Sequence, residues 1–175
     1  PEIVAETAVD LHMRAMVGTP VIEFPTAWAS NTAECLSKGA ELVHDPYADH
    51  PLISSCFVPH STATVSDEAV TELRVLADQL DRRIQIHLHE SAQEIENELN
   101  CNGKRPIERL QDLGLINASL MAVHAVHVTD DEIALFADAG VVVAHCPRSN
   151  LKLADGIAPI AAFTPLKSKP HRTRC

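Results

Sequence analysis

Histidines recur at one kind of position in this chain. They lie at or just beyond the carboxyl ends of apolar, strand-like runs: His60, His87, His89, His124, His127 and His145. The carboxyl ends of parallel strands meet at one edge of a sheet, where reactive groups gather. Neutral imidazole is a common ligand of zinc, iron and nickel. The recurrence therefore indicates a metal site at that edge.

The run His-Leu-His-Glu, which ends at Glu90, adds a carboxylate to the imidazoles. In an extended strand His87 and His89 would point to the same face. Glu90 comes where the strand turns into a loop, so one site could contain a ligand and a general acid or base. A bound metal can lower the pKa of water from about 15.7 to about 7. The alternatives are a hydrogen-bonded structural histidine at His87, a helix N-terminal charge at Glu90, and satisfied core histidines at His124 and His145.

Amphipathic helical segments separate the strand-like runs. Strands are expected at 13–22, 52–58, 83–90, 119–126 and 141–147. Helices are expected at 2–11, 31–42, 66–80, 91–99, 106–113 and 130–140, with Ser66 as an N-terminal cap and Gly140 as a C-terminal cap. This alternation predicts βαβ units and a parallel sheet. The nearly continuous apolar runs predict strands that are covered on both faces.

Length limits how much of such a fold the chain can form. At 175 residues it fits one domain but is shorter than the roughly 250 residues of a complete (β/α)₈ barrel. We expect the fold to occupy residues 1–162. The segment 163–175 has no helical or strand period, holds four of the 14 basic residues and no acidic one, and is expected to be an irregular, disordered tail.

Composition excludes several classes of partner. The net charge is −10 and aromatic residues make up only 3%, so a nucleic-acid partner is not expected. No apolar run approaches the roughly 18 residues of a membrane span. The five cysteines are scattered and form no Cys-x-x-Cys pair, which is typical of reduced thiols in a cytoplasmic protein. The composition is compatible with a homo-oligomer.

Four ordered motifs resemble a known family. They are FVPHSTATVSDE (57–68), IQIHLHESAQEIE (84–96), LMAVHAVHVTDDEI (120–133) and VVAHCPRSNLKLADGIAPI (142–160). Together they resemble the amidohydrolase superfamily, in particular the chlorohydrolase-like branch that includes 5-methylthioadenosine/S-adenosylhomocysteine deaminases. The resemblance runs from about residue 3 to residue 162.

The resemblance implies a fold and an activity. The fold would be a partial (β/α)₈ TIM-type barrel with about five parallel strands and flanking helices. The activity would be the hydrolytic deamination of a purine nucleoside, a small-molecule substrate, with one divalent metal ion, first zinc and alternatively iron. By match, His87 resembles the fifth-strand metal ligand. Glu90 resembles the proton shuttle that also contacts substrate, His124 the histidine that holds the hydroxide, and His60 a substrate-binding histidine.

The sequence departs from the family pattern at both ends. The family's His-x-His pair has no counterpart before residue 13, and no Thr-Asp-Gly segment follows Pro159. Three of the four metal ligands that the resemblance implies therefore have no match, and we expect a truncated sequence that is inactive as an isolated chain. Within the class, a guanine deaminase or a triazine chlorohydrolase-like enzyme remains open. Outside the class, the alternative is a non-catalytic fragment.

Overall fold

A computed structural model describes residues 1–43 and 50–163. Its strands are β1 (Ala15–Val21), β2 (Ile53–Pro59), β3 (Arg83–Leu88), β4 (Leu120–His124) and β5 (Val142–Ala144). Its helices are α1 (Glu2–Asp10), α2 (Thr32–Val43), η1 (Thr62–Thr64, a 3₁₀ turn), α3 (Asp67–Gln79), α4 (Ala92–Asn102), α5 (Pro106–Asp112), α6 (Asp130–Ala139), α7 (Pro147–Leu153) and α8 (Ile160–Phe163). Every expected strand and helix is present, and η1, α7 and α8 are additional.

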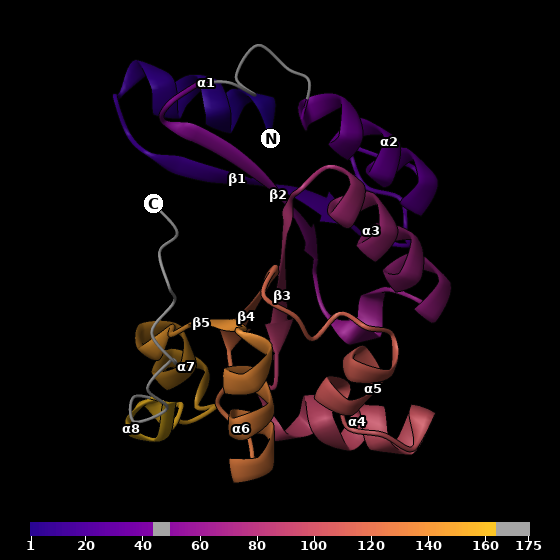
Figure 1. The fold of residues 1–175 in the computed structure, drawn as a ribbon, viewed down its shortest axis with the longest axis vertical. Coiled ribbons are helices and arrows are strands. Elements are labelled where there is room, and N and C mark those ends of the chain that lie inside the picture. The colour runs from indigo at the N-terminus through magenta and orange to yellow at the C-terminus, as the bar shows by residue number, and fades with distance from the viewer. Residues whose placement is uncertain (44–49, 164–175) are drawn as a thin grey trace, which may run out of the picture.

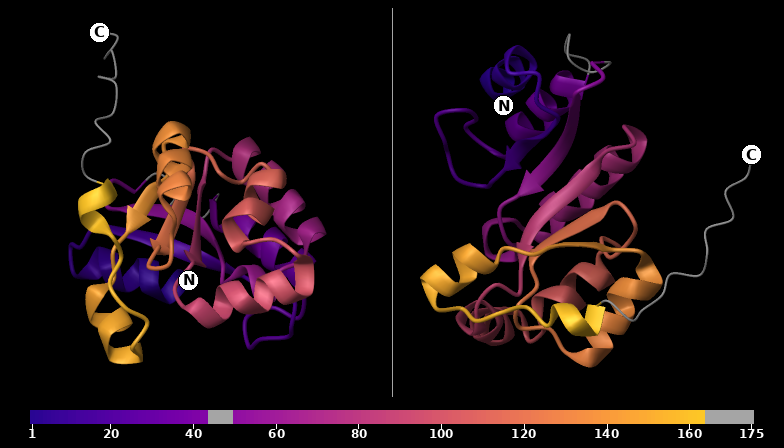
Figure 2. Two further views of the ribbon diagram at one scale, coloured as in Figure 1. Left: turned by 90° about the horizontal axis from the view of Figure 1, so that it is seen from below. Right: turned by 90° about the vertical axis from the view of Figure 1, so that its left-hand side faces the viewer.

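The strands form one parallel sheet in the order β1-β2-β3-β4-β5. Sequence order and spatial order are therefore the same, as in a barrel that winds in one direction. Helix α1 lies at the β1 end of the sheet and α8 at the β5 end (Figure 1). The right-hand view of Figure 2 shows the same separation. The α/β fold predicted from the sequence, part of a TIM-type barrel, is confirmed.

The hydrophobic core lies between one face of the sheet and helices α2, α3, α5 and α6. Strand β3 shows the alternation, because Ile84, Ile86 and Leu88 are buried in this core. Gln85 and His87 alternate with them on the other face and are only half-buried. The expectation that both faces of the strands are covered therefore fails for β3 within the described residues. Its second face is open at the position of His87.

The helix ends follow the predicted capping chemistry. Ser66 accepts a hydrogen bond from the Ala69 backbone N–H at the start of α3. Gly140 ends α6 in the left-handed region, at φ 75°, where glycine has no Cβ to clash. Helix α7 was not predicted, and the expected strand 141–147 included its first residue, Pro147. A proline at the first helical position is favourable, however, since the N–H it lacks has no intrahelical partner there.

The expected division of the chain at residues 162 and 163 falls inside α8, which ends at Phe163. Residues 164–175, the rest of the predicted basic tail, lie outside the described residues. None of the helices in the described part of the chain combines the length and the apolar character needed to span a bilayer.

Candidate functional site

Three of the predicted site histidines meet at one edge of the sheet. His60 directly follows β2, His87 lies next to the last residue of β3, and His124 ends β4. The ring centroids of His60 and His87 lie 4.8 Å apart. Those of His87 and His124 lie 5.4 Å apart, with the planes stacked at 28°. The parallel register produces this row, because Leu88 of β3 pairs with His124 of β4.

Glu90 joins the same group of side chains. Its Oε1 atom lies 3.2 Å from Nε2 of His124, at the open end of β3. The carboxylate is half-buried, whereas the side chain of His124 is only 6% exposed. A carboxylate beside an imidazole can accept and return protons, as general acid–base chemistry requires.

Glu94 holds the backbone that carries Glu90, and the sequence analysis missed it. Its carboxylate accepts hydrogen bonds from the backbone N–H groups of His89 (3.0 Å) and Glu90 (2.8 Å). Burial raises the pKa of Glu94, although these backbone donors act in the opposite direction. The sequence did contain a pattern that could have identified Glu94. Ser91 and Glu94 form the Ser-x-x-Glu pattern of a helix N-terminus, and Ser91 caps α4 in the structure.

His89 does not share the face of His87, which corrects the sequence-based expectation. Strand β3 ends at Leu88, and His89 adopts φ 53°, in the left-handed region. This turn sends the His89 ring into the layer of helices, where it is 0% exposed and its Nε2 accepts a hydrogen bond from the Ile107 N–H. His89 is therefore a satisfied core histidine.

The tautomer of His87 suits a metal ligand. Its Nδ1 atom lies 2.7 Å from the backbone carbonyl oxygen of His60. A carbonyl oxygen only accepts hydrogen bonds, so Nδ1 carries the hydrogen and Nε2 keeps a lone pair. Metal-binding histidines are commonly oriented in this way by a second hydrogen bond.

One fitting histidine does not make a complete metal centre. Within residues 1–43 and 50–163, no group of three or more His, Cys, Asp or Glu side chains is placed to hold a metal ion. A zinc site ordinarily uses three or four protein ligands. The described residues therefore fit one ligand position and leave the others to be supplied from elsewhere.

His60 is the most exposed member of the row. Partial burial lowers its pKa, the neighbouring His87 lowers it further, and Glu90 acts in the opposite direction. A neutral His60 would present a hydrogen-bond donor and an acceptor to a ligand on the open face. His145, at the end of β5, is exposed.

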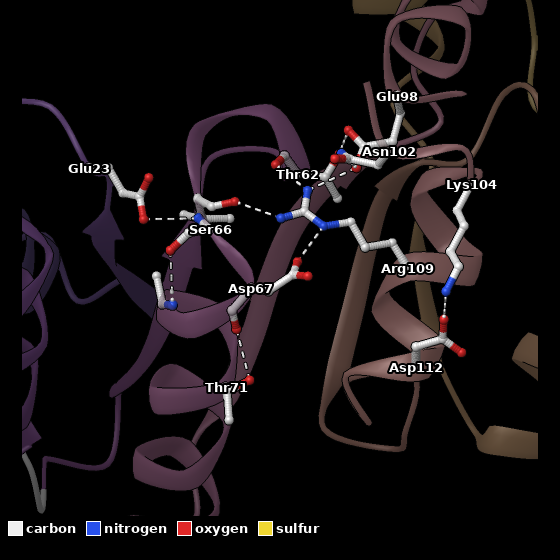
Figure 3. A network of polar contacts seen from close by, with 12 residues as sticks. Glu23, Thr62, Ser66, Asp67, Thr71, Glu98, Asn102, Lys104, Arg109 and Asp112 are labelled. Carbon is white, nitrogen blue, oxygen red and sulfur yellow. Dashed lines mark hydrogen bonds and ion pairs between the residues drawn. The ribbon is translucent and has the colours of Figure 1, made fainter. Parts of the chain in front are cut away.

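A network of polar contacts around Arg109 fixes the segment that follows His60 (Figure 3). The Arg109 guanidinium donates to the carbonyl oxygens of Thr62 (2.7 Å) and Val65 (3.0 Å). It also forms ion pairs with Asp67 (2.6 Å) and Glu98 (2.8 Å). One side chain of α5 thereby ties η1, the start of α3 and α4 together at this end of the sheet.

Asn150 is the second residue that the sequence analysis missed. It lies on α7, is 0% exposed, and its Nδ2 atom lies 2.9 Å from Nδ1 of His124. The motif VVAHCPRSNLKLADGIAPI contained it, but its type and spacing alone gave no reason to place it against a histidine of β4.

Comparison with known proteins decides the family. Residues 2–163 match the amidohydrolase family. The chain belongs to this family. It is 44% identical over 163 residues to a 5-methylthioadenosine/S-adenosylhomocysteine deaminase of Teredinibacter turnerae, and 42% identical over 160 residues to one of Saccharophagus degradans. These matches cover 93% and 91% of the chain but only 37% and 36% of the relatives, so the amidohydrolase chain spans little more than a third of their length.

Solved structures agree with this assignment. An adenosine deaminase from Xanthomonas campestris, with bound zinc, superposes with a TM-score of 0.91 at 45% identity. That match covers 94% of the chain and 37% of the solved structure. An atrazine chlorohydrolase from Arthrobacter aurescens, complexed with zinc, has a TM-score of 0.83 at 22% identity and covers 92% and 38%, respectively. At 22% identity, the similarity to the atrazine chlorohydrolase shows a shared fold alone.

Proposed function

We propose that this amidohydrolase chain carries the proton-transfer half of a metal-dependent deaminase site that acts on an adenine-type nucleoside. The observation that carries the proposal is the 3.2 Å contact of Glu90 with His124, beside the lone pair on Nε2 of His87. The relatives named as 5-methylthioadenosine/S-adenosylhomocysteine deaminases support that substrate class.

In this proposal each residue has one task. His87 is a metal ligand through Nε2, and His60 contacts the substrate on the open face. Glu90 accepts a proton from the attacking water and delivers it to the purine ring nitrogen. His124 orients that water through Nε2. Addition of water to the carbon bearing the amino group gives a tetrahedral adduct. Transfer of its remaining hydroxyl proton to the amino group allows the C–N bond to break, which gives an inosine-type product and ammonia.

The proposed cofactor is a divalent metal ion, with zinc as the first choice. When bound, it would lower the pKa of a coordinated water molecule. The zinc-bound solved relative supports this choice. His87 is the described residue whose tautomer fits the metal, and the remaining ligands would come from the part of the barrel that this chain does not span.

A non-catalytic fragment is the second candidate function. It is favoured by the lack of any group of three metal-ligating side chains within the described residues. A chain of this kind would bind a nucleoside or a partner without turnover.

A chimera separates the two candidates. Residues 2–163 would replace the aligned segment of the Teredinibacter turnerae relative, which supplies the rest of the barrel. We expect the zinc-loaded chimera to release ammonia from 5-methylthioadenosine. The Glu90→Gln variant should lose about two to four orders of magnitude in kcat, the usual contribution of general acid–base catalysis.

Glu96→Gln, an exposed position on α4, is the matched control and should retain full activity. A folded chimera that binds zinc but releases no ammonia would support the non-catalytic fragment. Equal activities of the Glu90→Gln and Glu96→Gln variants would remove Glu90 from the mechanism.

A further inference from the structure

The side chain of Asn150 is placed to control which nitrogen of His124 carries hydrogen. Both side chains are buried, with Asn150 0% and His124 5% exposed as residues. The Asn150 amide nitrogen lies 2.9 Å from Nδ1 of His124, and Oε1 of Glu90 lies 3.2 Å from its Nε2. The imidazole of His124 therefore lies between an amide and a carboxylate.

The chemistry of these neighbours selects one arrangement. An ionised carboxylate only accepts hydrogen bonds, so the Glu90 oxygen 3.2 Å from Nε2 of His124 favours the tautomer that carries its hydrogen on Nε2. A neutral imidazole has a single ring N–H, which leaves Nδ1 as an acceptor. The NH₂ group of Asn150 is then the partner that Nδ1 requires.

The backbone holds both residues in place. His124 and Ala125 adopt φ values of 78° and 47°, which fix the direction of the His124 side chain where β4 ends. The Asn150 N–H donates to the carbonyl of Cys146, and the Asn150 carbonyl accepts from the Asp155 N–H. Because both side chains are also buried, rotation of the His124 ring to exchange its nitrogens is hindered.

We propose that Asn150 is a positioning residue that keeps the hydrogen of His124 on Nε2, facing Glu90. The catalytic meaning rests on the proposed function, because only there does Nε2 face the reacting water. The tautomer itself does not depend on that function and can be measured in the 175-residue chain.

The test is long-range ¹H–¹⁵N NMR of the imidazole side chains, with His124→Gln used to assign the resonances. At about pH 9 free imidazole is neutral, so the two nitrogens give distinct N–H and lone-pair signals. We expect the wild-type chain to have a hydrogen on Nε2 of His124 and none on Nδ1. A wild-type chain with the hydrogen on Nδ1 overturns the proposal without any variant.

Two substitutions test the cause. In Asn150→Asp the new carboxylate is an acceptor, so a hydrogen should appear on Nδ1 of His124. Ser149→Ala changes an exposed neighbour on α7 and should leave the spectrum as in the wild type. An unchanged His124 tautomer in a folded Asn150→Asp chain contradicts the proposal.

If Asn150→Asp does not fold, Asn150→Ser replaces it. A serine hydroxyl is shorter than the amide, so we expect both tautomers of His124 to become populated; a pure Nε2–H tautomer would overturn the proposal. Neither result changes the expected ammonia release by the chimera. Failure of this inference is thus distinguishable from failure of the proposed function.

Discussion

The buried ring of His89 makes a quantitative prediction about stability and pH. It is fully buried between α5 and α6, with Nδ1 3.6 Å from Glu132 and 3.4 Å from Arg105. The pKa of His89 is lowered to about 4, chiefly by burial; the charge of Arg105 contributes to the lowering, whereas Glu132 acts in the opposite direction. The folded chain therefore keeps this ring neutral at pH values where a free histidine takes up a proton.

The sign and size of the effect follow from proton linkage. In the unfolded chain the pKa of His89 returns to about 6.5, so the unfolded state binds more protons between about pH 6.5 and 4. Stability from this group is present at neutral pH and is lost as the pH falls. A shift from 6.5 to about 4 amounts to about 3 kcal/mol in total, of which about 2 kcal/mol is lost between pH 7 and pH 5.

Urea denaturation at pH 7 and at pH 5 measures this loss. In His89→Gln the amide oxygen can still accept the Ile107 N–H, but the side chain no longer titrates. We expect the variant to lose about 2 kcal/mol less than the wild type between the two pH values. His145→Gln, at an exposed position, is the control and should behave as the wild type. Equal losses in the wild type and in His89→Gln would refute the reasoning.

Two further predictions concern the network around Arg109 and the isolated chain. Arg109→Leu leaves Glu98, whose side chain is 5% exposed, without its cation, so the free energy of unfolding in urea should fall by about 3–5 kcal/mol. The double variant Arg109→Leu/Glu98→Leu should lose less free energy of unfolding than the two single variants lose together. A loss equal to their sum would show that the two charges are not coupled. The zinc-supplemented 175-residue chain should release negligible ammonia from 5-methylthioadenosine, because its described residues fit one ligand position. Measurable metal-dependent release would contradict this expectation.

The sequence was informative wherever a local pattern determined the structure. Apolar runs predicted the strands, and the parallel arrangement followed from the helices between them. Strand-end positions were sufficient to bring His60, His87 and His124 together, because the ends of adjacent parallel strands are neighbours. The predicted caps Ser66 and Gly140 are confirmed for the same reason, since capping depends on adjacent residues.

The sequence failed where contacts between distant segments decide the outcome. The alternation of side chains in a β-strand predicted that His89 shares the face of His87. In the structure the left-handed turn after Leu88 instead directs His89 toward Arg105 and Glu132. Neither of these partners is visible from the pattern of β3. Asn150 was missed because its role depends on α7 packing against the end of β4.

The zinc content of the chimera tests the central claim most directly. The claim is that imidazoles from successive strands meet at one edge of the sheet, where His87 is the metal ligand that this chain supplies. After dialysis against metal-free buffer, the wild-type chimera and its His60→Ala variant should retain about one zinc ion per chain. The His87→Ala variant should lose it. Full zinc retention in His87→Ala would contradict the account.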